Sequence, residues 1–440
     1  MVKTGLYWFN HDLRVHDNLA LLEASLNCDR LICLFCYDSA WSRPTGLNAK
    51  PLGEQRRQFL NQTLLELDQQ LTLRGQKLII ISGDPVAIIS RLIDQFDVSA
   101  VYRSHHVGVY ENRQWQHLCA DFPRLEFESL WTHTLFQRHQ LPFSLDELPV
   151  SFTQFRKLVE NLTIDKPLKM PRRLAPPVSE TVRGSEPLQV RSRCKNTFQG
   201  GEASALAHLE AYFDSDYPAR YKCLRNDLQG WSHSTKMSPW LANGSLSPRR
   251  VLQRLKAYEQ SQLANDSTYW IFFELLWREY FQWVAIKQAH KLFRPQGVGR
   301  HKISCCFYPE RYQKWCHGNT PYPLVNALMK QLNETGYMSN RGRQIVASCL
   351  VNELQLDWRF GAAYFEQQLI DFDVASNWGN WQYIAGVGMD PRGGRHFNID
   401  KQTRQYDPDG DFIRQWHGEV VSARLDSVDA ADWPIMPDKQ

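Results

Sequence analysis

The sequence predicts an α/β domain with a doubly wound parallel sheet, then a long linker and an all-α second domain. Three observations lead to this prediction. Short apolar runs alternate with helix-period segments over residues 1–131, prolines punctuate residues 132–200, and helical spacing dominates residues 201–417. Strands separated by crossover helices form βαβ units, and such units assemble into a parallel sheet covered by helices on both faces.

The first domain, residues 1–131, contains five apolar runs of strand length. They are Gly5–Phe9, Leu31–Tyr37, Leu78–Ser82, Ala100–Arg103 and Leu125–Phe127. Two apolar stripes between these runs have helical spacing, and they consist of Leu60, Leu64, Leu67 and Leu71, then Val86, Ile89, Leu92, Ile93 and Phe96. Ligands on such sheets lie beyond the carboxyl ends of the strands. Because no glycine-rich dinucleotide or Walker fingerprint is present, we expect a ligand other than a conventional dinucleotide.

The proline-rich residues 132–200 predict a linker that wraps the surface, because proline at this density breaks regular structure. One short helix is expected within it, at Phe152–Val159. Residues 201–417 should form the helical domain and residues 418–440 a C-terminal tail. Helices are expected near Leu206, Leu209 and Phe213 and in the segments 245–260, 268–290, 323–334, 339–356 and 361–370.

The composition excludes several classes of protein. A formal charge of +4 is too small for a basic tail protein, although it permits a local cationic patch. The longest apolar stretch, Tyr269–Ile286, contains Glu274, Arg278 and Glu279, so we expect no membrane span. The chain lacks the features of a signal peptide, and its ten cysteines fit reduced thiols, so we expect a cytoplasmic protein.

The helix expected at Tyr269–Gln288 is apolar almost all round, which predicts that it is buried. Glu274, Trp277, Arg278 and Phe281 recur at helical intervals and share one stripe. A buried carboxylate needs a partner, because removing a lone charge from water is costly. One interpretation is a Glu274–Arg278 ion pair beside core aromatics. The other is a cavity wall that offers a carboxylate, a cation and an indole to a stacked base.

A hydroxyl-rich segment, Ser232–Pro239, ends at a proline that is typical of a first helical turn. Hydroxyl groups and free N–H groups at a helix N-terminus favour phosphate, and Tyr221, Lys222 and Arg225 lie shortly upstream. The alternative interpretation is an ordinary Ser/Thr helix cap.

Two polar clusters follow in the C-terminal third. Ser339 is a candidate N-cap for a helix that starts with the polar segment Asn340–Gln344. Asp371 and Asp373 are two residues apart, as in some divalent metal sites. Since no further acid or histidine lies at ligand spacing nearby, pairing of one acid with Arg343 is the more economical interpretation, and we expect no metal.

Taken together, these motifs resemble the photolyase/cryptochrome family from about residue 4 to about residue 417. The motifs are Trp8-Phe9-x-x-Asp12-Leu13-Arg14-x-x-Asp17-Asn18, Tyr221-Lys222-x-x-Arg225-Asn226, Glu274-Leu-Leu-Trp277-Arg278-Glu279, Asn340-Arg-Gly-Arg343 and Asp371-x-Asp373-x-x-x-Asn377-x-Gly379-x-Trp381. Within the family the chain is similar to DASH-type cryptochromes. The markers are Leu141-Pro142-Phe143, Phe152-Thr-x-Phe155-Arg-Lys-x-Val159-Glu160, Met338-Ser-Asn-Arg-Gly-Arg-Gln344 and Asn380-Trp-x-Tyr383.

The resemblance implies FAD, folded into a U within the helical domain. Arg343 and Asp371 would pair beside the isoalloxazine, and Asn377 would face N5, where protein groups adjust the redox state of a flavin. The residues that the resemblance assigns to FAD binding are Tyr221, Ser234, Thr235, Lys236, Met237, Ser238, Arg278, Arg343, Asp371, Asp373 and Asn377.

The resemblance also implies a substrate, a cyclobutane pyrimidine dimer rotated out of the DNA strand. Trp277 would stack on the dimer, while Glu274 and Asn340 would bond its base edges, and a photon would drive one electron from reduced FAD to the dimer and back. Duplex-acting relatives tend to have Met and Trp where Gln344 and Tyr383 stand, so we expect a preference for single-stranded DNA. We also expect the protein to act as a monomer. The alternatives are a blue-light signalling photoreceptor and a nucleic-acid-binding protein without catalysis.

Two further features follow from the resemblance. Relatives carry an antenna pigment, in many DASH-type proteins the folate 5,10-methenyltetrahydrofolate, and Glu111 is the candidate contact. Flavin photoreduction in the family uses a tryptophan chain, whose inner two members match Trp381 and Trp358. The surface member is normally a tryptophan within 305–308, where this chain has Cys-Cys-Phe-Tyr, so Tyr308 is the candidate replacement.

Overall fold

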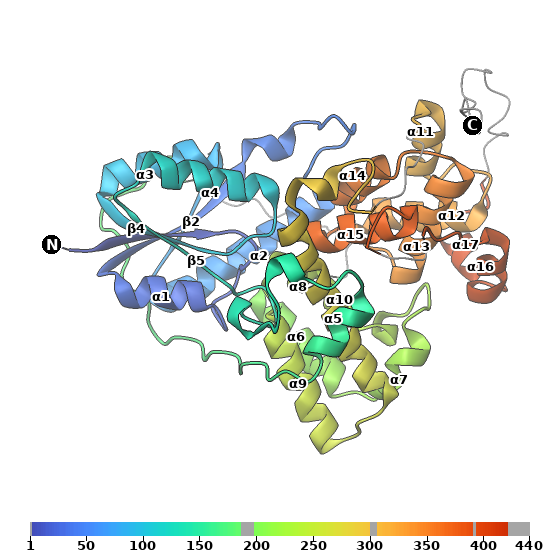
Figure 1. Cartoon of the computed structure of the whole chain (residues 1–440), viewed down its shortest axis with the longest axis horizontal. Helices are drawn as coiled ribbons and strands as arrows, with labels where there is room; N and C mark the ends of the chain where they lie inside the picture. Colours follow the sequence, from blue (N-terminus) through green and yellow to red (C-terminus); the bar gives the residue numbers. More distant parts are fainter. Residues whose placement is uncertain (1, 186–197, 300–305, 390–392, 421–440) are drawn as a thin grey trace.

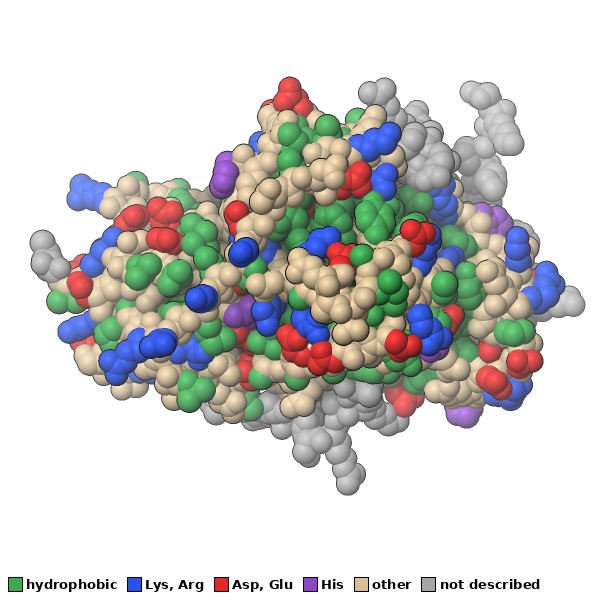
Figure 2. Space-filling view, turned by 90° about the horizontal axis from the view of Figure 1, so that it is seen from below, with side chains coloured by type: hydrophobic (Ala, Val, Ile, Leu, Met, Phe, Trp, Pro, Cys, Tyr) green, Lys and Arg blue, Asp and Glu red, His purple; other side chains and the backbone are tan. Residues whose placement is uncertain are grey.

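The computed structural model describes residues 2–185, 198–299, 306–389 and 393–420. A sheet domain lies at one end of the molecule and a helical part at the other (Figure 1). On the face seen from below, Lys and Arg are interspersed with Asp and Glu, and hydrophobic side chains lie between them (Figure 2). The described residues contain no helix that is both long and apolar enough to cross a membrane.

The sheet domain has five parallel strands in the order β3-β2-β1-β4-β5. The strands are β1 (Thr4–Phe9), β2 (Arg30–Asp38), β3 (Leu78–Gly83), β4 (Val98–Ser104) and β5 (Glu126–Leu130). Each coincides with one of the five expected runs, which confirms the doubly wound parallel sheet. The order changes direction between β1 and β4, and ligands on open α/β sheets bind at such a switch point.

Helices cover both faces of the sheet, as expected. They are α1 (Leu19–Asn27), α2 (Glu54–Thr72), α3 (Pro85–Phe96) and α4 (Val109–Asp121). Alternate strand residues point to opposite faces, so Tyr7 and Phe9 share a core with α1 and α2, whereas Leu6 and Trp8 share a core with α3 and α4. Only α2 and α3 carried the helical stripes recognised in the sequence.

The described part of the segment between β5 and the next long helix is largely irregular. It contains two 3₁₀ turns, η2 (Arg138–Gln140) and η3 (Leu145–Glu147), and the short helix α5 (Phe152–Val159), which confirms the predicted helix. Phe152 and Phe155 pack into the helical core, whereas Leu174 packs against the sheet domain. The segment therefore contacts both parts of the molecule.

The helical part begins at residue 202. Its elements are α6 (Glu202–Phe213), α7 (Tyr217–Leu224), η4 (Trp231–His233), α8 (Ser238–Asn243), α9 (Pro248–Ser261), α10 (Asp266–Gln288), η5 (Ala289–Phe293), α11 (Pro309–His317), α12 (Pro323–Thr335), α13 (Asn340–Ser348), η6 (Cys349–Glu353), α14 (Trp358–Gln368), α15 (Val374–Ala385), α16 (Ile399–Tyr406) and α17 (Asp411–Gln415). Helix α10 packs against α5, α7, α9 and α15. Buried polar contacts join the two parts, since Arg249 donates to Asp17 at 2.7 Å and Arg14 donates to the Gly244 carbonyl at 2.7 Å.

Two expectations for this part were wrong. The helix expected over 339–356 ends at Ser348 and continues only as the π-helical turn η6, because its backbone widens at Cys349–Glu353. Helix α10 is not buried all round, because a stripe that includes Trp270, Phe273 and Trp277 stays half-buried. That stripe lies where no other helix covers α10 completely.

Candidate functional site

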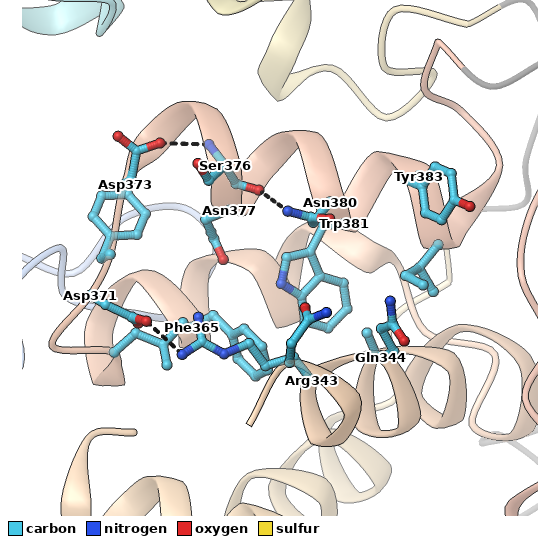
Figure 3. A pocket seen from close by; sticks show the side chains of 15 residues that line it. Arg343, Gln344, Phe365, Asp371, Asp373, Ser376, Asn377, Asn380, Trp381 and Tyr383 are labelled. Atoms are coloured by element: carbon cyan, nitrogen blue, oxygen red, sulfur yellow. Dashed lines mark hydrogen bonds and ion pairs between the residues drawn. The ribbon is translucent and has the colours of Figure 1, made fainter. Parts of the chain in front are cut away.

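A polar pocket lies among α13, α14 and α15 (Figure 3). It gathers most of the polar residues singled out in the C-terminal third of the sequence. Its lining includes Asn340, Arg343, Gln344, Asp371, Asp373, Asn377, Trp381 and Tyr383. Hydrophobic walls come from Phe365, Leu369 and Ile384. A concave site with apolar walls and convergent polar groups is typical of a cofactor or substrate site.

Arg343 and Asp371 form the expected ion pair in this pocket. Arg343 Nη2 donates to Asp371 Oδ2 at 2.7 Å, and Ser238 Oγ donates to the same oxygen at 2.6 Å. The charge of Asp371 raises the pKa of Arg343, although burial alone would lower this pKa. The other carboxylate oxygen, Asp371 Oδ1, is buried and has no partner among the described residues. A buried acceptor of this kind needs a ligand donor or a water.

Asp373 caps α15 and joins that helix to α10. Its Oδ1 accepts from the Ser376 amide at 2.7 Å, and both of its oxygens accept from Gln282 Nε2, at 3.0 and 2.9 Å. His133 Nε2 lies 3.6 Å from Oδ2. Burial acts in the opposite direction, but the nearby His133 and the charge of Arg278 hold the pKa of Asp373 well below its usual range. Asp373 is therefore a fixed negative charge at the edge of the pocket.

Asn377 lies one turn further along α15. Its Nδ2 donates to the Ala362 carbonyl of α14 at 3.0 Å, and its oxygen faces into the pocket (Figure 3). One of the two amide N–H groups is thus used, and the side chain offers its oxygen as an acceptor to a ligand. Among the described residues no group of three or more His, Cys, Asp or Glu could hold a metal ion.

The interpretation of Glu274 and Arg278 as an ion pair was wrong. Glu274 pairs instead with Arg225, at the C-terminal end of α7. Arg278 turns the other way and donates to the His133 carbonyl at 2.8 Å and to the Leu241 carbonyl at 3.3 Å. The spacing on one helix allowed a pair, but partners from other elements offered better hydrogen bonds to each side chain.

Trp277 lies outside the pocket lining, against α5. Its ring stacks on Phe152 with centroids 3.8 Å apart and an interplanar angle of 15°. The Tyr383 ring, which does line the pocket, lies 6.3 Å from Trp277 in an edge-on orientation. The structure thus places Glu274 and Trp277 on α10 beside the pocket and not within its wall.

The hydroxyl-rich segment reaches the pocket through Ser238 alone. Ser234 and Thr235 are half-buried, the Thr235 carbonyl accepts from His208, and Met237 is buried in the core. Lys236 has a left-handed backbone with φ of 52° and lies 4.9 Å over the Tyr337 ring. Tyr221 is buried on α7, with Arg225 5.9 Å above its ring. The helix that follows the segment has only six residues, so its dipole offers a phosphate little.

The two tryptophans of the predicted chain, Trp381 and Trp358, are both buried, and each contacts a different neighbouring indole. Trp381 contacts Phe365 at 5.1 Å and Trp315 at 6.2 Å. Trp358 contacts Trp378 at 5.7 Å, and its indole nitrogen donates to the Pro295 carbonyl. Tyr308 is 7% exposed and lies beneath the guanidinium of Arg311 at 4.6 Å. Trp315, which the sequence did not single out, therefore contacts Trp381 directly.

A second, larger cavity of about 2330 Å³, measured with its opening to solvent, lies between the sheet domain and the helical part. It sits at the carboxyl ends of β1, β2 and β4, as the topology predicts. Its lining includes Trp8, Asp38, Trp41, Arg56, His106, Glu111, Glu366 and Trp378. Of these, only Glu111 was predicted as a site residue, because the others come from segments far apart in the sequence.

Glu111 lies in this cavity close to a histidine. His106 Nδ1 is 3.5 Å from Glu111 Oε2 and also accepts the Gly108 amide at 2.9 Å. Burial opposes the change, but the electrostatic interaction with His106 lowers the pKa of Glu111 to about 2. Burial raises the pKa of the second carboxyl, Glu366, to about 7. The cavity therefore offers one fixed anion and one carboxyl that can carry a proton.

Two family descriptions match the chain: DNA photolyase over residues 5–172 and the FAD binding domain of DNA photolyase over residues 270–438. A cryptochrome DASH from Idiomarina loihiensis is 50% identical over 435 residues, which are 98% of this chain and 97% of that one. A cryptochrome DASH from Vibrio parahaemolyticus is 48% identical over 434 residues, again 98% of this chain and 97% of that one.

Solved structures agree with the sequence matches. The crystal structure of a Synechocystis cryptochrome superposes with a TM-score of 0.90 at 39% identity, covering 94% of this chain and 89% of that one. A bacterial class III photolyase from Agrobacterium tumefaciens superposes with a TM-score of 0.81 at 27% identity, covering 94% and 86%. This chain therefore belongs to the photolyase/cryptochrome family, within the group of DASH cryptochromes.

Proposed function

We propose that this protein is a blue-light-driven, FAD-dependent enzyme that repairs cyclobutane pyrimidine dimers, with a preference for single-stranded DNA. The observation that carries the proposal is the cluster of Arg343, Asp371 and Ser238 at the mouth of an apolar-walled pocket. A structural ion pair alone would not need the unpartnered Asp371 Oδ1 that it leaves there. In the proposed enzyme this oxygen accepts a hydrogen bond from the flavin.

The pocket residues fit a flavin. Asp371 and Asp373 offer acceptors, Arg343 offers a cation and Asn377 offers an amide oxygen, while Phe365 and Leu369 supply apolar contact for a ring system. Tyr221 and the segment Ser234–Ser238 would hold the phosphate side, with Ser238 as the link to the ring side. Reduced FAD supplies one electron to the dimer on absorbing blue light and recovers it after the ring has split. The protein's part is to hold both partners close and to exclude water.

The substrate would be held at the rim of the pocket. Asn340, Gln344 and Tyr383 line the pocket, and Trp277 lies beside Tyr383. Glu274, kept in place by Arg225, would accept a hydrogen bond from a base edge, and Trp277 would lie against the dimer. Flipping a dimer out of a single strand costs less than flipping it from a duplex, because fewer stacking and pairing contacts are lost. The face shown in Figure 2 mixes charges of both signs, which suits weak phosphate contacts.

The larger cavity is the proposed site of a folate antenna, 5,10-methenyltetrahydrofolate. Glu111 is ionised there and would accept hydrogen bonds from the amino and ring N–H groups of a pterin edge. Trp8, Trp41 and Trp378 supply aromatic surfaces in the same cavity. We further propose that the protein acts as a monomer in the cytoplasm, a location that the buried, unpaired Cys33 and Cys36 fit.

Repair of a thymine-dimer oligonucleotide, single-stranded or duplex, in darkness or blue light, tests the proposal. With FAD fully reduced, we expect light-dependent repair that is faster on the single strand. Binding without repair on either substrate would contradict the enzyme and leave the second candidate, a blue-light signalling photoreceptor. The observation that favours this second candidate is that the relatives from Idiomarina and Vibrio are named cryptochromes.

A further inference from the structure

The sequence leaves open the route by which electrons reach the pocket. Trp381 lies in the pocket wall, and Tyr308 stands where a surface tryptophan was expected. The guanidinium of Arg311 lies 4.6 Å over the Tyr308 ring. A cation held against an aromatic face opposes the removal of an electron from that ring, because the product would be a second positive charge. Tyr308 is therefore a poor final donor.

Trp315 on α11 is placed better to serve Trp381. Their ring centroids lie 6.2 Å apart at 72°, an edge-to-face contact. Trp315 is fully buried, and its indole nitrogen donates to the Val346 carbonyl at 3.0 Å, which fixes the ring and places a partial negative charge beside it. That dipole favours a positive charge on the indole. Because burial removes water from around the ring, the carbonyl dipole is the group that stabilises the positive charge.

Phe365 closes the gap between the two indoles. Its ring lies 5.1 Å from Trp381 and 6.1 Å from Trp315, so the three rings form one packed group. On Trp315 the row of rings continues to Tyr312 at 6.5 Å and Tyr364 at 5.7 Å. Trp358, by contrast, has its ring contact with Trp378, which lines the other cavity.

We propose that Trp315 is an electron donor to Trp381, in parallel with Trp358. The inference rests on the proposed binding of FAD beside Trp381. With FAD bound and excited by blue light, Trp381 would give one electron to the flavin and would then recover one electron from Trp315. No bond forms or breaks, and the positive charge moves to Trp315, further from the flavin. An external thiol would finally return one electron to Trp315 and lose its proton, and two of the resulting thiyl radicals would combine to form a disulfide.

The test compares Trp315→Phe, Trp358→Phe and the double variant, each loaded with oxidised FAD. Both tryptophans are buried and each donates one hydrogen bond to a carbonyl, so the two replacements disturb the fold to a similar degree. Transient absorption after a blue flash follows the indole radical, and flavin absorbance under steady light with thiol follows photoreduction. We expect Trp358→Phe to keep the long-lived indole radical and a photoreduction rate several-fold above that of the double variant.

If Trp358→Phe already falls to the level of Trp381→Phe, Trp315 donates nothing and the inference is wrong. The inference is equally wrong if the double variant photoreduces as fast as Trp358→Phe. Should the double variant not fold, Trp358→Phe against Trp381→Phe still decides. If the wild-type chain binds FAD and photoreduces, and Trp315→Phe has no effect alone or together with Trp358→Phe, only this inference is refuted. A wild-type chain that binds no FAD refutes the proposed function itself.

Discussion

The polar pocket of the helical part and the cavity between the two domains differ in how their charged groups are arranged. In the helical pocket Arg343 pairs with Asp371, and the charge of Arg278 favours the ionised form of Asp373. In the cavity between the domains, burial raises the pKa of Glu366 to about 7, although Arg56 lies near enough to oppose that shift. A site with charges fixed in advance suits a cofactor whose electronic state must be controlled. A roomy cavity with aromatic walls suits a pigment that only has to be held.

The largest expected effect is the loss of flavin photoreduction in a variant of the helical pocket, with no change in the other cavity. Trp381→Phe should block flavin photoreduction, because it removes the indole in the pocket wall, while leaving ligand binding in the other cavity intact. Flavin absorbance under blue light with thiol is the measurement. Trp283→Phe, which also replaces a buried indole, is the control and should photoreduce normally. Full photoreduction of Trp381→Phe would break the assignment, whereas repair by chemically reduced FAD should survive.

A smaller effect is expected at the rim of the helical pocket. Glu274→Gln keeps the shape of the side chain but removes the charge that Arg225 and a base edge both use. Loss of a hydrogen bond to a charged group costs about 1.5–3 kcal/mol, so single-strand repair should slow about tenfold to a hundredfold. Glu259→Gln on α9, which removes a similar ion pair with Lys256, is the control. Unchanged repair in Glu274→Gln would place the substrate elsewhere.

The counterpart in the other cavity is Glu111→Gln. We expect folate to bind about tenfold more weakly, since one charged hydrogen bond is lost, while the affinity for FAD stays the same. Fluorescence titration with each ligand measures both affinities on one preparation. A parallel loss of FAD affinity would mean that the two cavities are not independent.

The smallest effect concerns pH. Burial raises the pKa of Glu366 to about 7 from an ordinary value of 4.5, so the folded chain holds a proton that the unfolded chain has lost between these values. The stability from this group is full below the lower value and is lost as the pH rises through the higher one. Glu366→Gln cannot titrate, so the unfolding temperature of the wild type relative to this variant should fall from about pH 5 to about pH 8. A constant difference would show that Glu366 ionises normally.

Much of the fold could be predicted because buried parallel strands appear as continuous apolar runs. Helix α15 was missed, because Ser376, Asn377 and Gly379 interrupt its apolar periodicity, although Asp373 in front of it is a typical cap. In the site, the Arg343–Asp371 pair was predictable because no further acid or histidine near Asp371 and Asp373 could complete a metal site. The partner of Glu274 was not, since Arg225 precedes it by 49 residues and only tertiary packing joins them. The position of the cavity between the domains could be predicted from the sheet topology, but its lining residues could not.

The central claim is that the cluster around Asp371 exists to hold a flavin, and titration of the chain with FAD tests it most directly. Flavin fluorescence should be quenched at one equivalent in the wild type. Asp371→Asn, which keeps the side-chain shape but loses the ion pair with Arg343 and the free acceptor charge, should bind FAD about tenfold to a hundredfold more weakly. Circular dichroism checks that the variant folds. No binding of FAD by the wild type in excess, or equal binding by both chains, would contradict the account.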